Sequence, residues 1–160
     1  MPATTDPIKL LKEDHTKVKG LFKEFEEADG RSQKRIAKEA IMELEVHAQI
    51  EEEIFYPAFL EQVKDEMIAA EAEEEHHVAE QLMAEIKQML DSGQTDVHFE
   101  AKFTVLAENV RHHIEEEEKE MLPKAQKQMD KELLQQLGEQ MAERKEQLMS
   151  EMKKAGSAAR

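Results

Sequence analysis

The stretch HAQIEEEIFYP, residues 47–57, places His47 and Glu51 four residues apart among the apolar side chains of Ile50, Ile54 and Phe55. The stretch HIEEEEKEMLP, residues 113–123, repeats this arrangement: a histidine, a pair of glutamates four and five residues later, and a proline ten residues later. Residues four apart lie on the same face of a helix. Each stretch therefore predicts one imidazole and one carboxylate aimed at the same point, with a kink or a helix end near the proline.

The composition around these stretches is typical of an all-α protein. The chain has 160 residues, of which 37% are charged and 4% aromatic, and only five are Gly and four Pro. Most of the rest are helix formers such as Ala, Glu, Lys, Leu, Gln and Met. We therefore expect one all-α domain, large enough to bury a substantial core.

Apolar residues recur in steps of three and four over four segments, each the length of a helix. They run over residues 8–25, starting behind the N-cap candidate Asp6 and Pro7, and over 37–58, 66–90 and 99–121, with a loop at DSGQTD, residues 91–96. This pattern predicts an up-down-up-down four-helix bundle over residues 1–125. Residues 126–160 add an amphipathic C-terminal helix to the same domain, with Gly138 as a weak point and a frayed tail at 153–160.

Six polar residues lie on the stripes that otherwise face inward, and every helix of the bundle contributes at least one: His15, His47, Glu51, His76, His113 and Glu117. A buried, unpaired carboxylate costs several kcal/mol or must be protonated. No Lys or Arg lies at the same level on these stripes. A metal cation would remove this cost, because it accepts neutral imidazole and ionised carboxylate together.

At least six ligands are too many for one tetrahedral zinc ion, so the set predicts two metal ions bridged by Glu51 and Glu117. Glu80, one turn after His76, is a further candidate ligand at the edge of its stripe. A register shifted by one residue would replace His113 and Glu117 with His112 and Glu116, but the match to His47 through the proline favours His113. The remaining polar residues are expected to have other roles. Glu52 and Glu118 lie outside the ligand shell or in solvent, with Glu118 the stronger candidate for an exception, and Asp14 and Glu75 face solvent. His77, His98 and His112 lie at the surface or rim. Tyr56 anchors the end of the bundle, and the alternative is a phenol that donates hydrogen bonds or is oxidised near a metal pair.

Composition also excludes several classes of protein. The absence of cysteine excludes disulfides, Fe–S clusters, thiolate zinc sites and cysteine nucleophiles. A net charge of −15 argues against nucleic acid as a partner. The first residues lack the pattern of a signal peptide, and no apolar run approaches the roughly 20 residues that span a bilayer. We expect a cytoplasmic protein with no membrane partner.

The order His15, His47-x-x-x-Glu51, His76, His113-x-x-x-Glu117 resembles the hemerythrin-like family, also called HHE cation-binding domains. The segments EDH, HAQIEEEIFYP, EEEHH and HIEEEEKEMLP carry the resemblance, which covers about residues 8–125. It implies a non-haem diiron centre, with two iron ions (Fe2+ or Fe3+) joined by an oxo or hydroxo bridge, that meets O2 or a related small molecule. The ferritin-like alternative is disfavoured, because its Glu-x-x-His motif occurs here only incidentally.

Two departures separate the chain from oxygen-carrying hemerythrins. Those proteins have a second histidine on the third helix, where this chain has Glu80, and an acidic residue five after the histidine of the fourth helix, where the pattern here favours Glu117 at plus four. A ligand set with more carboxylate and less imidazole favours ferric iron and weakens reversible O2 carriage.

Two functions follow as hypotheses. One is a diiron protein that binds or reacts with O2, NO or peroxide; if it is an enzyme, the reaction is catalase-like or NO turnover at the metals, with no protein nucleophile or general base. The other is an iron buffer or an iron/oxygen sensor that acts through metal-dependent folding or partner binding. In the second case the C-terminal helix would serve as the surface for a protein partner or for homo-oligomer formation.

Overall fold

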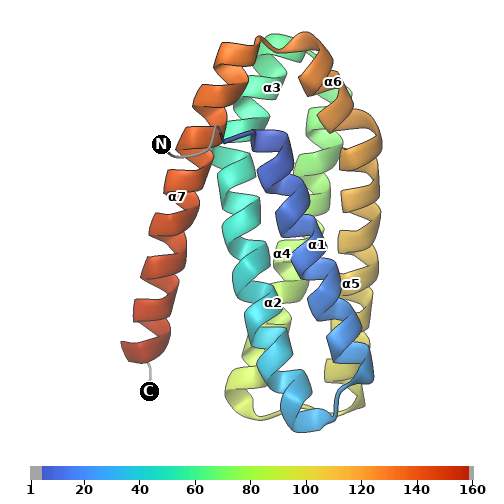
Figure 1. Cartoon of the computed structure of the whole chain (residues 1–160). Coiled ribbons are helices and arrows are strands. Elements are labelled where there is room, and N and C mark those ends of the chain that lie inside the picture. The colour runs from blue at the N-terminus through green and yellow to red at the C-terminus, as the bar shows by residue number, and fades with distance from the viewer. Residues whose placement is uncertain (1–4, 159–160) are drawn as a thin grey trace.

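The computed structural model describes residues 5–158, and the described chain is all-α. Four long helices stand side by side as a bundle: α1 (Pro7–Glu27), α2 (Gly30–Ile50), α4 (Glu66–Ser92) and α5 (Val97–Glu116) (Figure 1). Two short helices, α3 (Tyr56–Val63) and α6 (Leu122–Gln128), extend α2 and α5 at the same end of the bundle. The predicted four-helix bundle with an additional C-terminal helix is therefore confirmed.

The ends of the long helices follow local rules. The side chain of Asp6 accepts a hydrogen bond from the backbone N–H of Ile8 at 3.0 Å, and Pro7 occupies the first turn of α1. The loop after α4 begins at Gly93, whose φ of 76° is in the left-handed region that glycine adopts without strain. Asp96 then caps α5 by accepting from the N–H groups of His98 and Phe99.

Pro57 and Pro123, the prolines of the two repeated stretches, do not end their helices. Instead each follows a short π-helical turn: Glu51–Phe55, here called the first π turn, and Glu117–Met121, the second π turn. In the first, the N–H of Tyr56 bonds to the carbonyl of Glu51; in the second, the N–H of Leu122 bonds to the carbonyl of Glu117. In an α-helix a proline clashes with the carbonyl four residues earlier. A wider turn relieves that crowding, so the chain continues as α3 and α6.

The core consists of two apolar clusters. One lies towards the α1–α2 and α4–α5 loops and contains Phe22, Phe25, Phe99 and Phe103. The other lies towards α3 and α6 and contains Ile50, Phe55 and Met121. The predicted inward-facing polar residues lie between these clusters along each helix, so they form a polar layer in the middle of an apolar interior.

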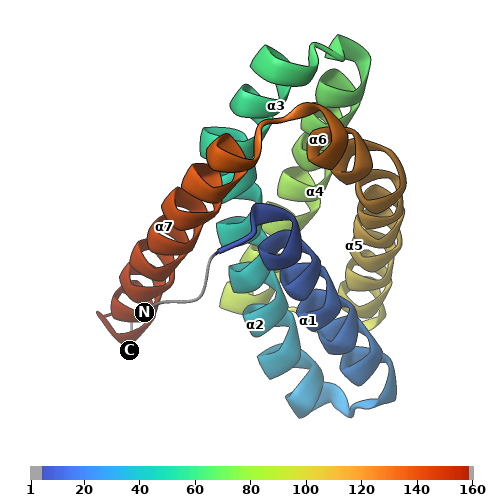
Figure 2. The same cartoon turned by 45° about the horizontal axis from the view of Figure 1, so that its top comes forward.

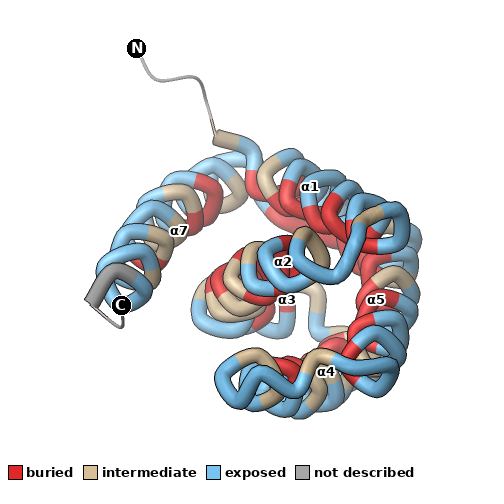
Figure 3. The backbone as a smooth tube through the Cα atoms, turned by 90° about the horizontal axis from the view of Figure 1, so that it is seen from below, coloured by how far each residue is buried: buried red, intermediate tan, exposed pale blue. Residues whose placement is uncertain are grey.

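The helix α7 (Lys131–Ala158) packs on the outside of the bundle against α1 and α2. The chain passes over the end of the bundle from α6 to reach it (Figure 2). The buried, red-coloured stretches of α7 face the bundle (Figure 3). Leu137, Met141 and Leu148 are buried there and belong to the same apolar cluster as Ile50 and Phe55. Gly138 is needed for this packing, because a Cβ there would lie 2.1 Å from the backbone oxygen of Thr5.

The predicted frayed tail is only partly inside the described chain. The helix α7 continues to Ala158, so most of the segment 153–160 is helical, and residues 159 and 160 lie outside the described residues. Among residues 5–158, no helix is both long and apolar enough to cross a membrane.

Candidate metal centre

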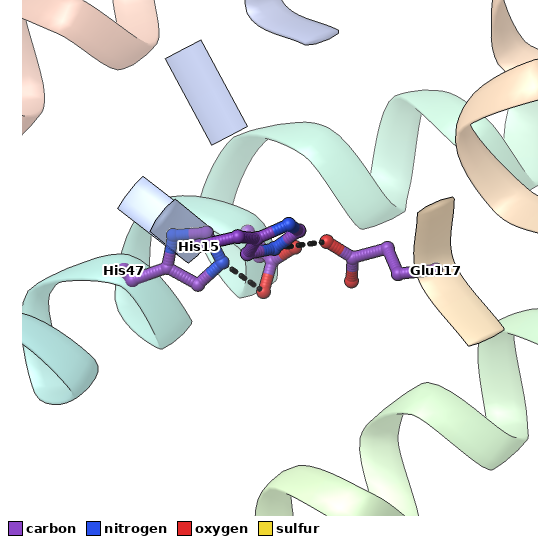
Figure 4. Close-up of side chains that lie close together, drawn as sticks. His15, His47 and Glu117 are labelled. Carbon is purple, nitrogen blue, oxygen red and sulfur yellow. Dashed lines mark ion pairs between the residues drawn. The ribbon is translucent and has the colours of Figure 1, made fainter. Parts of the chain in front are cut away.

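The structure brings together all six of the inward-facing polar residues. Each is buried, and each comes from one wall of the bundle: His15 from α1, His47 from α2, His76 from α4 and His113 from α5. Glu51 and Glu117 are the first residues of the two π turns and are 0% and 3% exposed. His15, His47 and Glu117 point towards one another across the interior (Figure 4).

The first group of ligand atoms comes from His15, His47, Glu51 and Glu117, all within 4.8 Å of one another. The Nε2 atom of His15 lies 3.2 Å from Glu117 Oε1, and the Nε2 atom of His47 lies 3.2 Å from Glu51 Oε1. Two imidazoles and two carboxylates therefore converge on one point at one side of the polar layer.

The second group comes from Glu51, His76 and His113. Glu51 Oε1 lies 3.2 Å from His76 Nε2, and Glu117 Oε2 lies 3.1 Å from His113 Nε2. Glu51 thus belongs to both groups, and Glu117 presents one oxygen to His15 and the other to His113. The two carboxylates lie between the two pairs of histidines.

Tyr56 belongs to this second group, although we expected it to anchor the end of the bundle. Its buried hydroxyl donates to Glu117 Oε2 at 2.8 Å and lies 3.1 Å from His76 Nε2 and 3.2 Å from His113 Nε2. The first π turn explains the position, because it brings Tyr56 one turn after Glu51 on the same face. The phenol is therefore a further candidate ligand or proton donor at the centre.

Each of the four histidines donates from Nδ1 to a carboxylate on a neighbouring helix. His47 donates to Asp14 at 2.9 Å and His113 to Glu75 at 2.8 Å. His76 donates to Glu52 at 3.0 Å and His15 to Glu118 at 2.8 Å. The four bonds form a closed ring around the bundle. A carboxylate of α1 accepts from the histidine of α2, and one in the first π turn accepts from the histidine of α4. A carboxylate of α4 accepts from the histidine of α5, and one in the second π turn accepts from the histidine of α1. We refer to these four acceptors as the carboxylate ring.

The ring corrects part of the sequence prediction. Asp14 and Glu75 were expected to face solvent, but Asp14 is 5% exposed and the Glu75 side chain 26%. Their direction depends on the neighbouring helix, which offers an imidazole N–H to each. Glu52 and Glu118, which we expected outside the ligand shell, each contact the Nδ1 side of a histidine.

The helix α7 also reaches this ring. Lys145 forms a short hydrogen-bonded ion pair with Asp14, which in turn holds His47. The neighbouring Arg144 pairs with Glu53 on the bundle surface at 2.9 Å and makes no such link. One residue of the C-terminal helix is therefore two contacts away from the candidate ligands.

The chemistry of the donor set fits metal ions. In the described part of the chain, five buried side-chain atoms make no well-formed hydrogen bond: His15 Nε2, His47 Nε2, both carboxylate oxygens of Glu51, and Glu117 Oε1. Their 3.2 Å contacts are with one another and with His76 Nε2, all atoms of the same centre. Unsatisfied buried polar atoms are rare because each costs about 1–3 kcal/mol. The Nδ1–carboxylate bonds place the proton on Nδ1 and leave the Nε2 lone pair for a ligand, as in many metal sites. All five atoms face the centre, where a cation would satisfy them.

In the metal-free chain, protons take the place of the cation. Burial alone would lower the pKa of His47, but the charge of Glu51 and the hydrogen bond to Asp14 raise it to about 10. Burial would likewise lower the pKa of His76, but the contacts with Glu51 and Glu52 raise it to about 9. Burial would raise the pKa of Glu117, but its contacts with Glu51, His113 and His15 hold it well below its usual range. Metal binding must therefore displace protons from these imidazoles.

The other candidates lie elsewhere. Glu80 is exposed and lines a surface groove together with Glu52, so it is not brought to either group. His77 and His98 are exposed, and the side chain of His112 is 66% exposed, so the register of α5 places His113 and Glu117 inside. Glu118, at plus five, contacts His15 Nδ1 from outside the centre.

A small cavity adjoins the two groups of candidate ligands, on the side that faces the α1–α2 and α4–α5 loops. Its volume is 40 Å³, and its apolar walls include Val18, Leu44, Met83, Val110 and Ile114. The four histidines of the centre also line it. One water-sized occupant needs about 10–15 Å³ on this measure. The cavity therefore has room for a molecule of two or three heavy atoms beside the candidate ligands.

Comparison with known proteins gives the family. The model of the hemerythrin HHE cation-binding domain matches residues 6–125. Proteins of Mycobacterium tuberculosis and Mycobacterium bovis, each described only as uncharacterized, are 31% identical over 142 residues, which is 87% of this chain and 84% of theirs. No solved structure matches the chain. The family match spans the four-helix bundle and every residue of the two buried groups, and the chain belongs to the hemerythrin HHE cation-binding domain family.

Proposed function

We propose that this protein is a hemerythrin-like diiron protein that binds or reacts with O2, NO or peroxide. The observation that carries the proposal is the convergence, between two apolar clusters, of five buried imidazole and carboxylate atoms that make no well-formed hydrogen bond. The residues that would hold the metal ions are His15, His47, His76, His113, Glu51 and Glu117, with Tyr56 in addition. An all-N and O donor set suits iron, and it exceeds what one zinc ion takes.

Two metal ions are supported by the division into two groups. His15 and His47 lie on one side, His76 and His113 on the other, and Glu51 and Glu117 contact both sides. A bound iron pair would supply two adjacent redox-active ions with positions open to a small molecule.

The surrounding residues restrict what reaches the centre. The cavity of 40 Å³ has room for a diatomic molecule or peroxide. Its apolar wall keeps bulk water away, and the hydroxyl of Tyr56 holds a proton 2.8 Å from Glu117 Oε2. The carboxylate ring increases the electron donation of all four imidazoles, which favours the ferric state over reversible O2 carriage.

The test is anaerobic reconstitution of the purified chain with Fe2+, followed by metal analysis and optical spectroscopy. We expect close to two irons per chain and a spectral change on addition of O2, NO or peroxide. A chain that retains no iron after reconstitution would refute the proposal. Steady-state consumption of peroxide or NO then separates a catalyst from a binding protein.

A second candidate function, an iron buffer or sensor, is favoured by one contact. Lys145 on α7 pairs with Asp14, which holds His47, so metal occupancy is coupled to the docking of the C-terminal helix. In this case removal of iron would loosen α7 and alter its availability to a protein partner or a second copy of the chain. Hydrogen exchange of α7 with and without iron tests this function independently of any reactivity.

A further inference from the structure

A second cluster of metal-ligand side chains lies on the surface between α4 and α5. It consists of Glu75, His112 and Glu116, whose ligand atoms lie within 4.8 Å of one another. His112 Nε2 lies 3.0 Å from Glu116 Oε1, one helical turn further on, and 3.9 Å from Glu75 Oε2. Each member keeps a route to solvent, since the three side chains are 66%, 37% and 26% exposed for His112, Glu116 and Glu75. We call this group the surface triad.

The surface triad differs from an ordinary solvated acidic face. It combines one imidazole with two carboxylates from two helices, which is the N, O, O set that divalent transition metals accept. Like-charged carboxylates that face each other at this range repel one another, and a bound cation would turn that repulsion into attraction. Three protein ligands leave positions for water, so binding would be weak and exchangeable.

A crevice leads inward from the same place. It is lined by Glu71, Glu75, Glu116, Glu117, Glu120 and His113, together with apolar residues of α4 and the second π turn. Its volume is 20 Å³, enough for about one water-sized occupant. Glu117 lies at its buried end and is 3% exposed; its Oε2 atom lies 3.1 Å from Nε2 of His113, which also lines the crevice. The crevice therefore joins the surface triad to Glu117 and His113 of the buried centre.

Glu75 connects the two places directly. One of its oxygens accepts from His113 Nδ1 at 2.8 Å, and the other faces His112. A cation at the surface triad would be held by a carboxylate that already supports a ligand of the buried centre.

We propose that the surface triad of Glu75, His112 and Glu116 binds a divalent transition-metal ion and delivers it through the acidic crevice to Glu117 and His113. The delivery step rests on the proposed metal centre, whereas binding at the surface triad does not. A register shifted by one residue would have made His112 a ligand of the buried centre; here it is instead a proposed ligand at the surface.

Binding is tested with Mn2+ on the full chain after reconstitution with Fe2+ and measurement of its iron content. The six-line electron paramagnetic resonance signal of free Mn2+ reports how much is bound. We expect one weak Mn2+ site per chain, weakened about tenfold or more, equivalent to about 1.4 kcal/mol, in His112→Ala and in Glu116→Gln. His77→Ala is the matched control, because His77 is an exposed histidine of α4 outside the surface triad, and this variant should bind Mn2+ as the parent chain does.

Delivery is tested with the metal-free chain and Fe2+ under anaerobic conditions. Tyr56 is the only tyrosine and the chain has no tryptophan, so intrinsic fluorescence reports events at the buried centre alone. His112→Ala should fill the centre about tenfold more slowly than the parent chain and His77→Ala, yet reach the same iron content.

The outcomes separate the two proposals. Equal Mn2+ binding by His112→Ala and His77→Ala would overturn the surface site, whatever the iron content. A surface site that binds Mn2+ without any effect on the filling rate would overturn delivery. A chain that takes up no iron refutes the buried centre, and the Mn2+ comparison of the two variants still decides the surface triad.

Discussion

The two repeated stretches, His47–Pro57 and His113–Pro123, build the same unit and meet different surroundings. Each contributes a histidine Nε2, a glutamate at the start of a π turn, and a carboxylate five residues after the histidine that supports a neighbouring helix. The first copy is enclosed: Asp14 behind His47 is 5% exposed and is held by Lys145 of α7. The second copy is open: Glu75 behind His113 borders the acidic crevice and the surface triad.

A further difference lies nine residues after each histidine. The first copy has Tyr56 at this position, with its hydroxyl among the ligand atoms, and the second has the apolar Leu122. One local pattern thus gives a closed half supported by α7 and an open half that faces solvent through carboxylates, and the phenol of the first copy reaches the ligands of the second. The comparison teaches that the repeat specifies the ligands, whereas the neighbouring helices specify access.

The largest expected effect comes from removing a carboxylate shared by both halves. Glu51→Ala should abolish most metal binding, because Glu51 belongs to both groups of ligand atoms. Glu117→Ala should act similarly. Iron content per chain after reconstitution is the measurement, with the exposed Glu61→Ala on α3 as control. Retention of two irons by Glu51→Ala would contradict the shared role.

The second prediction concerns pH. Metal binding displaces protons from imidazoles whose pKa is about 10 for His47 and about 9 for His76 in the metal-free chain. Below these values the apparent metal affinity should rise by about tenfold per pH unit for each proton displaced. Chelator competition at several pH values measures it, and an affinity independent of pH would count against protonated histidines in the metal-free centre.

The stability of the metal-free chain should move in the opposite direction. A pKa raised on folding means that the folded state holds its proton more tightly than the unfolded state. The stabilisation from His47 is therefore fully present below its ordinary pKa of 6.5 and is lost as pH rises through about 10. Denaturant unfolding of the metal-free chain between pH 7 and 10 should show this decline, and His47→Gln should show less of it.

The third prediction compares the supports of the two halves. Asp14→Asn and Glu75→Gln each remove the negative charge behind one histidine, and such changes typically weaken metal binding about 10–100-fold. We expect Asp14→Asn to have the larger effect, because Asp14 is buried and also pairs with Lys145. If the two variants lose equal metal affinity, or Glu75→Gln loses more, then burial of the supporting carboxylate does not make the first half bind metal more tightly.

The fourth prediction concerns the phenol that only the first copy carries. Tyr56→Phe removes the hydrogen bond to Glu117 at 2.8 Å and should lower metal affinity about tenfold. The ultraviolet difference spectrum of the parent chain on metal binding shows whether the phenol loses its proton, since Tyr56 is the only tyrosine. Unchanged affinity in Tyr56→Phe would leave the hydroxyl a purely structural group.

The smallest effect is expected from α7. Lys145→Met removes the partner of Asp14 and should weaken metal binding a few-fold, while Arg144→Met removes only a surface pair with Glu53 and should leave metal binding unchanged. The reciprocal measurement is hydrogen exchange in α7, which should increase when iron is removed. Equal metal binding by the two variants would show that the contact of α7 with Asp14 does not affect the metal centre.

Much of the centre could be predicted from the sequence, because it depends on spacing within single helices. The i, i+4 pairs of the two repeats and the apolar stripes around His15 and His76 were sufficient to name the six residues that the structure buries together. The carboxylate ring could not be found in this way. A residue adjacent to a ligand, such as Asp14 or Glu75, points away from its own stripe, and whether it meets solvent or an imidazole depends on the helix beside it. The only signal was the recurrence of an acid directly before His15 and His76 and five residues after His47 and His113.

The sequence by itself determined an all-α bundle with a polar layer in its interior, because helical periodicity is a local property of the chain. Only the tertiary structure decided which carboxylate supports which histidine, how α7 encloses one half, and where Tyr56 lies. On an ideal α-helix Tyr56 would be rotated about 140° from Glu51. The first π turn, formed where Pro57 disfavours an ordinary α-helical turn, brings the two onto one face and turns an apparent end anchor into part of the centre.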